Sequence, residues 1–162
     1  MNPAGQTVLV LGAGGAARAV VYALRQQGCT VWIVNRSRER AEALAAAFGC
    51  AGVLPLERDA LAECVAHADG FVNSTSLGME PHADTMPPVP VDALPAGAWV
   101  CDLVYRPLQT RLLETASARG LKTIDGLGML AHQGALAFER WTGSHAPVAT
   151  LRHAALAQIT DR

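Results

Sequence analysis

The segment that follows the first apolar run of this chain contains residues that could hold a phosphorylated ligand. Gly12, Gly14 and Ala17 have the spacing G-x-G-x-x-[G/A]. The first glycine permits a tight turn, the second lets the backbone approach a pyrophosphate, and the small third residue lets a helix pack close to the preceding strand. Free N–H groups and the helix dipole would then hold the anion. The alternative is an ordinary glycine-rich turn, but the position between a predicted strand and a predicted helix favours a dinucleotide site.

A second segment, after the next apolar run, offers basic and polar groups. An NAD site usually presents Asp or Glu at this point, whereas this chain presents Asn35, Arg36 and Ser37. Arg36 follows the predicted strand directly, and Arg40 lies one helical turn further on, so both can face a 2′-phosphate. For Arg38, a solvated position at the start of a helix is the better interpretation. The segment therefore predicts a preference for NADP over NAD.

Strand and helix patterns alternate along the whole chain. The predicted strands are residues 7–11, 30–34, 51–54, 70–73, 99–102 and 122–125. The predicted helices are residues 15–27, the segment from the Ser37 cap to residue 48, and residues 59–67, 110–119, 129–142 and 147–159. This alternation predicts an α/β fold: a Rossmann-like, doubly wound, mainly parallel six-stranded sheet with helices on both faces. Ligands of such sheets bind beyond the carboxyl ends of the strands, where the candidate residues lie.

The composition indicates one folded domain over residues 1–162. Hydrophobic residues make up 51% of the chain and its mean hydropathy is +0.21, which argues against disorder. A formal net charge of −1, without a basic run, disfavours nucleic-acid binding. The four cysteines are scattered without metal-ligand spacing, so we expect reduced thiols, no metal and a cytoplasmic protein. We see no targeting segment and no apolar run long enough for a membrane span.

Four further segments contain recognisable motifs: residues 73–79 (NSTSLGM), 102–110 (DLVYRPLQT), 125–134 (DGLGMLAHQG) and 138–143 (FERWTG). Together with the glycine turn and the arginine segment, their order and spacing closely resemble the cofactor half of the shikimate dehydrogenases. The quinate/shikimate dehydrogenases share the fold and most of these motifs.

The resemblance implies a role for individual residues. It places Tyr105 beside the substrate and gives Gln133 a hydrogen bond to a substrate hydroxyl or carboxylate. It places the following residues at the cofactor: Gly12, Ala13, Gly14, Gly15, Ala16, Asn35, Arg36, Ser37, Arg40, Asn73, Ser74, Thr75, Ser76, Leu103, Gly126 and Met129.

Several of these residues also have a purely structural interpretation. The run 73–76 is typical of a turn, and Tyr105 could be an aromatic residue at a rim with its hydroxyl in water. Gln133 shares a predicted helix face with Met129 and Leu136, where periodicity alone favours a core or interface glutamine with a hydrogen-bond partner.

The resemblance also implies what this chain lacks. In the family, a substrate domain precedes the dinucleotide domain and carries the catalytic Lys and Asp. Here the only lysine is Lys122, at the start of a predicted strand and away from the carboxyl ends, so no catalytic pair can be assigned. The family reaction is the reversible NADPH-dependent reduction of 3-dehydroshikimate to shikimate in aromatic amino-acid (chorismate) biosynthesis. We expect this chain to be the NADP-binding half, able to bind cofactor but nearly inactive alone.

The end of the chain carries a predicted apolar stripe. Val148, Leu151, Ala155 and Ile159 recur at helical spacing. In the family the terminal helices, here residues 129–159, return toward the substrate domain. Without that domain we expect the stripe to be exposed, which would favour a homodimer.

Two other functions remain open at this stage. One is the corresponding half of a quinate/shikimate dehydrogenase that uses NAD. The other is a non-catalytic, nucleotide-binding regulatory module. A different Rossmann reductase, such as a glutamyl-tRNA reductase-like domain, is disfavoured by residues 125–133.

Overall fold

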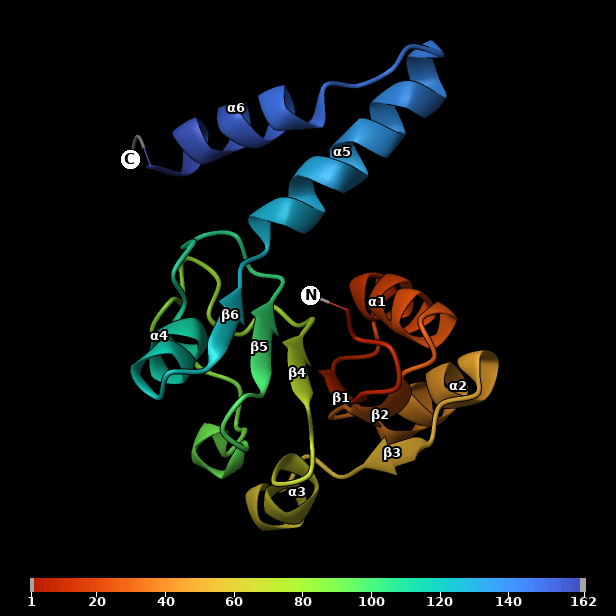
Figure 1. Ribbon diagram of the computed structural model, residues 1–162, viewed down its shortest axis with the longest axis vertical. Helices are drawn as coiled ribbons and strands as arrows, with labels where there is room; N and C mark the ends of the chain where they lie inside the picture. Colours follow the sequence, from red (N-terminus) through yellow and green to blue (C-terminus); the bar gives the residue numbers. More distant parts are fainter. Residues whose placement is uncertain (1, 161–162) are drawn as a thin grey trace.

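The computed structural model describes residues 2–160, which fold around one six-stranded sheet (Figure 1). The sheet order is β3-β2-β1-β4-β5-β6, and every neighbouring pair is parallel. This confirms the predicted Rossmann-like, doubly wound sheet. Strands β2 and β3 are added on one side of β1 and strands β4 to β6 on the other, so the topological switch point lies between β1 and β4. The strands are β1 (Thr7–Leu11), β2 (Thr30–Val34), β3 (Gly52–Leu54), β4 (Gly70–Asn73), β5 (Trp99–Asp102) and β6 (Lys122–Ile124).

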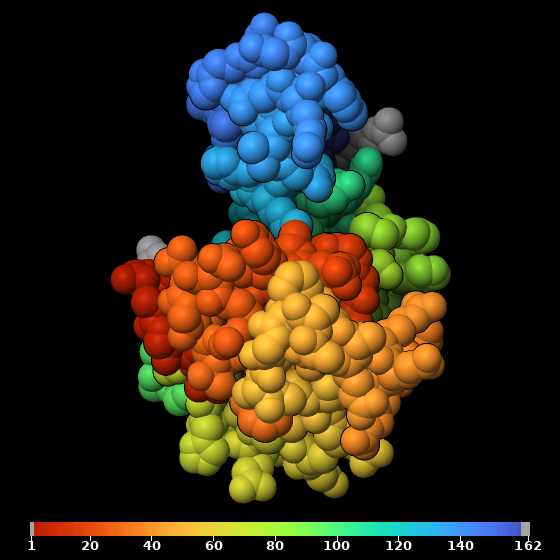
Figure 2. Space-filling model, turned by 90° about the vertical axis from the view of Figure 1, so that its right-hand side faces the viewer, coloured from red at the N-terminus to blue at the C-terminus, as the bar shows by residue number. Residues whose placement is uncertain are grey.

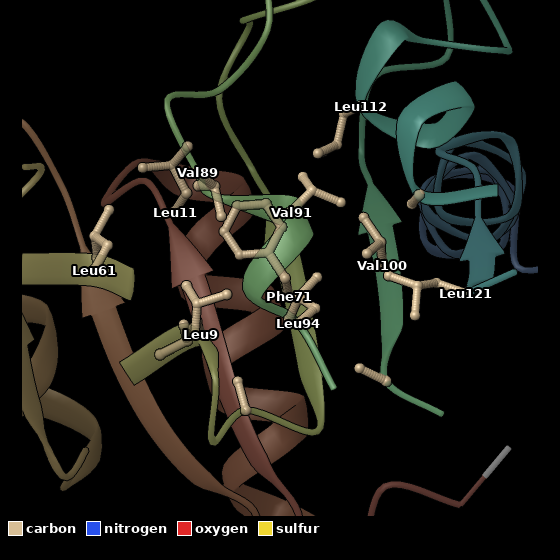
Figure 3. Packing of buried hydrophobic residues seen from close by; sticks show 14 of the residues in the cluster. Leu9, Leu11, Leu61, Phe71, Val89, Val91, Leu94, Val100, Leu112 and Leu121 are labelled. Carbon is tan, nitrogen blue, oxygen red and sulfur yellow. The ribbon is translucent and has the colours of Figure 1, made fainter. Parts of the chain in front are cut away.

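Each face of the sheet has its own apolar core. Successive residues of β1 alternate between the cores, with Val8 and Val10 in one and Leu9 and Leu11 in the other. Helices α1 (Gly15–Gln26) and α2 (Arg38–Phe48) cover the first core. Helices α3 (Arg58–Val65) and α4 (Arg111–Ala118) cover the second, together with a 3₁₀ helix, η1 (Val91–Ala93). Figure 3 shows the second core, with the ring of Phe71 at its centre.

The predicted elements agree with the observed ones to within two residues at each end. Their boundaries have the expected local causes. Ser37 caps α2 by accepting a hydrogen bond from the Arg40 N–H, and Gly49 ends α2 in the left-handed conformation. The helix η1 was not predicted, because it lies in a segment rich in proline, which interrupts the periodic patterns of longer helices.

Helix α5 (Leu127–Thr142) begins two residues earlier than predicted. The Asp125 carboxylate accepts a hydrogen bond from the Leu127 N–H at 3.0 Å, which turns the chain into the helix ahead of Met129. Gly126 then brings the start of α5 against the end of β5. A Cβ atom at Gly126 would lie 2.2 Å from the Leu103 carbonyl oxygen, so only glycine permits this approach.

Helices α5 and α6 (Val148–Thr160) pack side by side and extend away from the sheet (Figure 1). In Figure 2 they form a separate lobe above the rest of the molecule. The expectation that the α6 stripe is exposed is wrong, since Val148, Leu151, Ala155 and Ile159 are all half-buried. The exposed apolar side chains lie on α5 instead, where Leu136 is 67% and Trp141 is 83% accessible. Within residues 2–160, no helix has the length and apolar character needed to cross a membrane.

Two glycines at the start of α5 give a matched test of this junction. We expect Gly126→Ala to lower the free energy of unfolding by about 1–3 kcal/mol, because the added methyl group collides with backbone. A Cβ atom at Gly128 would meet nothing within 4 Å, so Gly128→Ala should raise stability by up to about 1 kcal/mol through helix propensity. Urea denaturation of both variants measures the difference, and equal effects would contradict the close approach.

Candidate functional site

The turn after β1 leaves backbone groups open to a ligand. Gly12 has φ +115°, and a Cβ atom there would lie 2.4 Å from the Ser74 hydroxyl oxygen, so both backbone conformation and space require glycine. The Ser74 hydroxyl donates to the Leu11 carbonyl at 2.6 Å and holds the turn against the end of β4. Gly14 and Gly15 are exposed, and no side chain caps the start of α1. The N–H groups of this helix end are therefore available to an anion.

The segment after β2 presents one arginine on a braced turn. The Asn35 amide donates to the Ser37 carbonyl at 2.8 Å, and the Ser37 hydroxyl caps α2, so both residues brace the turn that carries Arg36. Arg38 forms an exposed ion pair with Glu42 at 2.7 Å, in keeping with a solvated role. In the part of the chain that the structure describes, no carboxylate forms an ion pair with Arg36 or Arg40.

Two cavities meet at Arg36. The outer cavity, of about 350 Å³, lies between the Arg36 turn and the segment after β3. It is lined by Asn35, Arg36, Arg38, Val53, Leu54, Pro55, Leu56 and Glu57. The inner cavity, of about 280 Å³, lies between the same turn and the segment after β4. It is lined by Leu11, Asn35, Arg36, Leu56, Thr75, Ser76 and Leu77. Arg40, predicted to act with Arg36, lines neither cavity.

Asn73 shapes the loop after β4. Its side chain is fully buried, and its amide donates to the Asp102 carboxylate at 2.9 Å and to the Leu77 carbonyl at 3.1 Å. Its oxygen accepts from the hydroxyl and the N–H of Thr75, at 2.7 Å and 3.1 Å. All polar atoms of this side chain are thus used inside the protein. Asn73 was predicted to lie beside the cofactor, but the residues of this loop that line a cavity are Thr75, Ser76 and Leu77.

Asp102, at the end of β5, is a functional candidate that was not predicted from the sequence. Its buried carboxylate accepts from the Asn73 amide, from the Val104 N–H at 3.1 Å and from the Thr110 hydroxyl at 2.7 Å. Burial raises the pKa of Asp102, and the hydrogen bonds from Thr110, Val104 and Asn73 oppose that shift. The sequence did contain a signal for this role, which was a charged residue at the end of an apolar strand. A charge that is buried with such a strand needs hydrogen-bond partners.

The neighbouring cysteine is not a reactive thiol. Burial, with the nearby carboxylates of Asp102 and Asp125, raises the pKa of Cys101 to about 12. The thiol is therefore protonated at neutral pH. All four cysteines are free, and only Cys29 is fully buried. Over residues 2–160, no group of three or more His, Cys, Asp or Glu side chains is placed to hold a metal ion.

A third cavity, of about 150 Å³, lies where α1, the end of β5 and the start of α5 meet. It brings together six residues that the sequence singled out: Ala16, Leu103, Tyr105, Gly126, Met129 and Gln133. We name it the Met129 cavity. Tyr105 and Gln133 are exposed, so they lie at its rim. Leu130 also lines it and was not predicted. Ala13 is half-buried and packs against the core beneath α1.

The single lysine lies far from these cavities. Lys122 is exposed at the first position of β6, where it is in register with Trp99 at the start of β5. The three cavities lie at the opposite edge of the sheet, beyond the carboxyl ends of the strands. Lys122 thus lies at the amino end of its strand, as the sequence predicted.

Comparison with known proteins gives these cavities a context. A family described as shikimate / quinate 5-dehydrogenase matches residues 2–80, and the shikimate 5'-dehydrogenase C-terminal domain matches residues 126–156. The NADP(+) shikimate dehydrogenase of Desulforamulus reducens is 42% identical over 164 aligned residues, which cover 98% of this chain and 56% of that protein.

Solved structures agree with the sequence relatives. The shikimate 5-dehydrogenase of Thermus thermophilus, in complex with NADP(H) and shikimate, is 45% identical with a TM-score of 0.81, over 94% of this chain and 55% of that one. The quinate dehydrogenase of Corynebacterium glutamicum, in complex with NAD, is 35% identical with a TM-score of 0.82, over 94% and 55% of the two chains. This chain thus spans about half the length of these proteins. From the two matched segments, the sequence identity and the shared fold, we conclude that the chain belongs to the shikimate dehydrogenase family.

Proposed function

We propose that this chain binds NADP(H) along the carboxyl edge of its sheet and presents the nicotinamide to shikimate or 3-dehydroshikimate held by a second part of the enzyme. The observation that carries the proposal is the placement of three kinds of surface along one edge. A basic pair of cavities lies at Arg36, an uncapped helix end at Gly14, and a mainly apolar cavity at Met129. A dinucleotide with a 2′-phosphate has matching chemistry in the same order.

The phosphates would be held at two points. The exposed N–H groups at Gly14 and Gly15 suit the pyrophosphate, because nothing lies within 4 Å of where their side chains would be. Arg36 suits the 2′-phosphate, since it lines both cavities and has no carboxylate partner among the described residues. Thr75 and Ser76 would face the ligand between these points. Arg40 would add charge at longer range.

The nicotinamide would enter the Met129 cavity. Leu103, Gly126 and Met129 offer it an apolar wall, and the carbonyl oxygens of Leu103 and Val104 lie beside Gly126. The bound cofactor supplies the hydride, while the protein sets where that hydride points. Tyr105 and Gln133 stand at the rim, where a substrate hydroxyl or carboxylate could reach them. Because both side chains are exposed, a bound substrate could set their orientation.

We propose that proton transfer comes from outside this edge. Within residues 2–160, no lysine lies beside the Met129 cavity, and the one carboxylate buried close to it, Asp102, is occupied by three internal donors. The general acid and base of the reaction would then be supplied by the part of the enzyme that binds the substrate.

Two alternatives concern the ligand and the role. The similarity to a quinate dehydrogenase in complex with NAD keeps quinate and NAD as candidates. Arg36 argues against NAD, because it occupies the position from which an acidic side chain would accept hydrogen bonds from the ribose hydroxyls. A regulatory module would bind the nucleotide in the same way but would gain no activity from a substrate-binding partner.

The preference between NADP⁺ and NAD⁺ tests the role of Arg36. We expect Arg36→Ala to weaken NADP⁺ binding by about 10-fold to 100-fold, the loss of one charge-assisted contact, and to leave NAD⁺ binding nearly unchanged. Arg152→Ala, on the exposed surface of α6 and outside both cavities, is the matched control and should leave both affinities unchanged. Isothermal titration with both nucleotides measures the affinities. Equal losses for NADP⁺ and NAD⁺ would contradict the assignment of Arg36 to the 2′-phosphate.

Catalysis by the chain alone is a separate test of the proposal. The purified chain should bind NADPH yet form no NADPH above background when supplied with NADP⁺ and shikimate, since the proton-transfer groups are missing from this edge. Absorbance of the reduced nicotinamide follows the reaction. Steady turnover that copurifies with the chain, and that is lost in Arg36→Ala, would overturn this expectation. Adding a separately produced substrate-binding half of a relative tests the regulatory alternative, which predicts no gain.

We propose that the chain self-associates through α5. The apolar surface available for self-association lies on α5, at Leu136 and Trp141, rather than on the half-buried α6 stripe. We expect sedimentation velocity to show a dimer whose population rises with concentration, and Trp141→Ser to shift it toward monomer. His153→Ser, on the exposed side of α6, is the control. A wild-type chain that sediments as a monomer at every concentration would rule the dimer out.

A further inference from the structure

The buried carboxylate of Asp102 connects three segments that end at the ligand edge. One carboxylate oxygen accepts from the Asn73 side-chain amide at 2.9 Å and from the Val104 N–H at 3.1 Å. The other accepts from the Thr110 hydroxyl at 2.7 Å. Asp102, Asn73 and Thr110 are each at most 1% accessible, so solvent cannot replace any of these bonds.

The network continues into the loop that faces the inner cavity. The Asn73 oxygen accepts both the N–H and the hydroxyl of Thr75, and the Thr75 hydroxyl in turn accepts the Leu77 N–H at 3.2 Å. The Asn73 amide also donates to the Leu77 carbonyl. The conformation of this loop therefore depends on an asparagine whose own orientation is fixed by Asp102. The carboxylate accepts only, so it determines which end of the Asn73 amide faces it.

The same carboxylate oxygen of Asp102 also fixes the segment that faces the Met129 cavity. Its bond to the Val104 N–H shapes the chain between Leu103 and Tyr105, both of which line that cavity. The loops after β4 and β5 are also joined at the surface, where the Glu80 N–H donates to the Arg106 carbonyl and the two side chains form an ion pair at 2.8 Å. The surface pair is half-exposed and weak, so the buried carboxylate dominates.

We infer that Asp102 is a positioning residue: it fixes the inner cavity at Thr75 and the Met129 cavity at Leu103 relative to each other, so that a dinucleotide bound at one end places its nicotinamide correctly at the other. This inference rests on the proposed NADP(H) function. A purely structural role, as a partner for the cap of α4, would require only the bond to Thr110. The two bonds on the other oxygen serve no helix cap and instead connect the two cavity-lining loops.

The test separates the two ends of the ligand. 2′,5′-ADP reports the adenosine end alone, and the emission of bound NADPH reports how closely the nicotinamide is enclosed. For Asp102→Asn we expect 2′,5′-ADP affinity within about twofold of wild type and NADPH affinity lower by about fivefold to tenfold, with reduced emission of the bound nicotinamide. Asp59→Asn, on the exposed surface of α3, is the matched control and should leave all three readings unchanged.

Asn73 provides a second route if Asp102→Asn does not fold. Asn73→Ala removes the bond from the loop after β4 to Asp102, leaves the Thr110 cap of α4 in place, and should reproduce the loss of nicotinamide emission. Wild-type emission in both Asp102→Asn and Asn73→Ala, or equal losses for 2′,5′-ADP and NADPH in Asp102→Asn, would overturn the inference. A wild-type chain that binds neither ligand would instead overturn the proposed function on which the inference rests.

Discussion

The pairing of β1 with both β2 and β4 is the constraint on which the rest of this structure depends. Because β1 runs parallel to both neighbours, the chain leaves the three strands at the same edge of the sheet. The loops after Leu11, Val34 and Asn73 must then lie next to one another, although long stretches of sequence separate them. The crowding is severe enough that Gly12 can carry no side chain beside Ser74. The ligand edge is thus a consequence of strand order.

The two ends of this edge differ in their physical character. At the Arg36 end a guanidinium and short polar side chains lie among apolar ones, and they suit a charged group that keeps some water. At the Met129 end the lining is mainly apolar and the space is smaller. In the proposed complex, an electrostatic contact at one end would give affinity, while close packing at the other would give orientation. A network of internal hydrogen bonds between them serves neither purpose directly but fixes the distance at which both operate.

Local sequence signals predicted much of this arrangement. The glycine turn and Arg36 were predictable because each follows an apolar strand and has a spacing that only a tight turn or a helix start explains. Helix limits at Ser37 and Gly49 followed from capping chemistry. The resemblance then assigned Met129, Gly126 and Tyr105, which the structure places around one cavity.

The remainder depends on contacts between distant parts of the chain, which no local pattern contains. Asn73 looks like a ligand residue in sequence because it is polar and follows a strand, yet its partner Asp102 lies twenty-nine positions away and removes it from the surface. The α6 stripe was expected to be free, but the turn after α5 brings the two helices together and half-buries it. In both cases the exposure of the side chains was determined by packing between distant segments, which a local amphipathic or polar pattern does not contain.

Helix α5 leaves the sheet at Gly126 and leads away from it, so any rotation at this point would be amplified along the helix. A helix of 16 residues extends about 24 Å from its attachment, so a rotation of about 10° at Gly126 would move Trp141 by roughly 4 Å. Met129, less than one turn from the pivot, would move by under about 1 Å in the same rotation. A displacement of several ångströms at the far end of α5 would therefore leave the wall of the Met129 cavity almost in place.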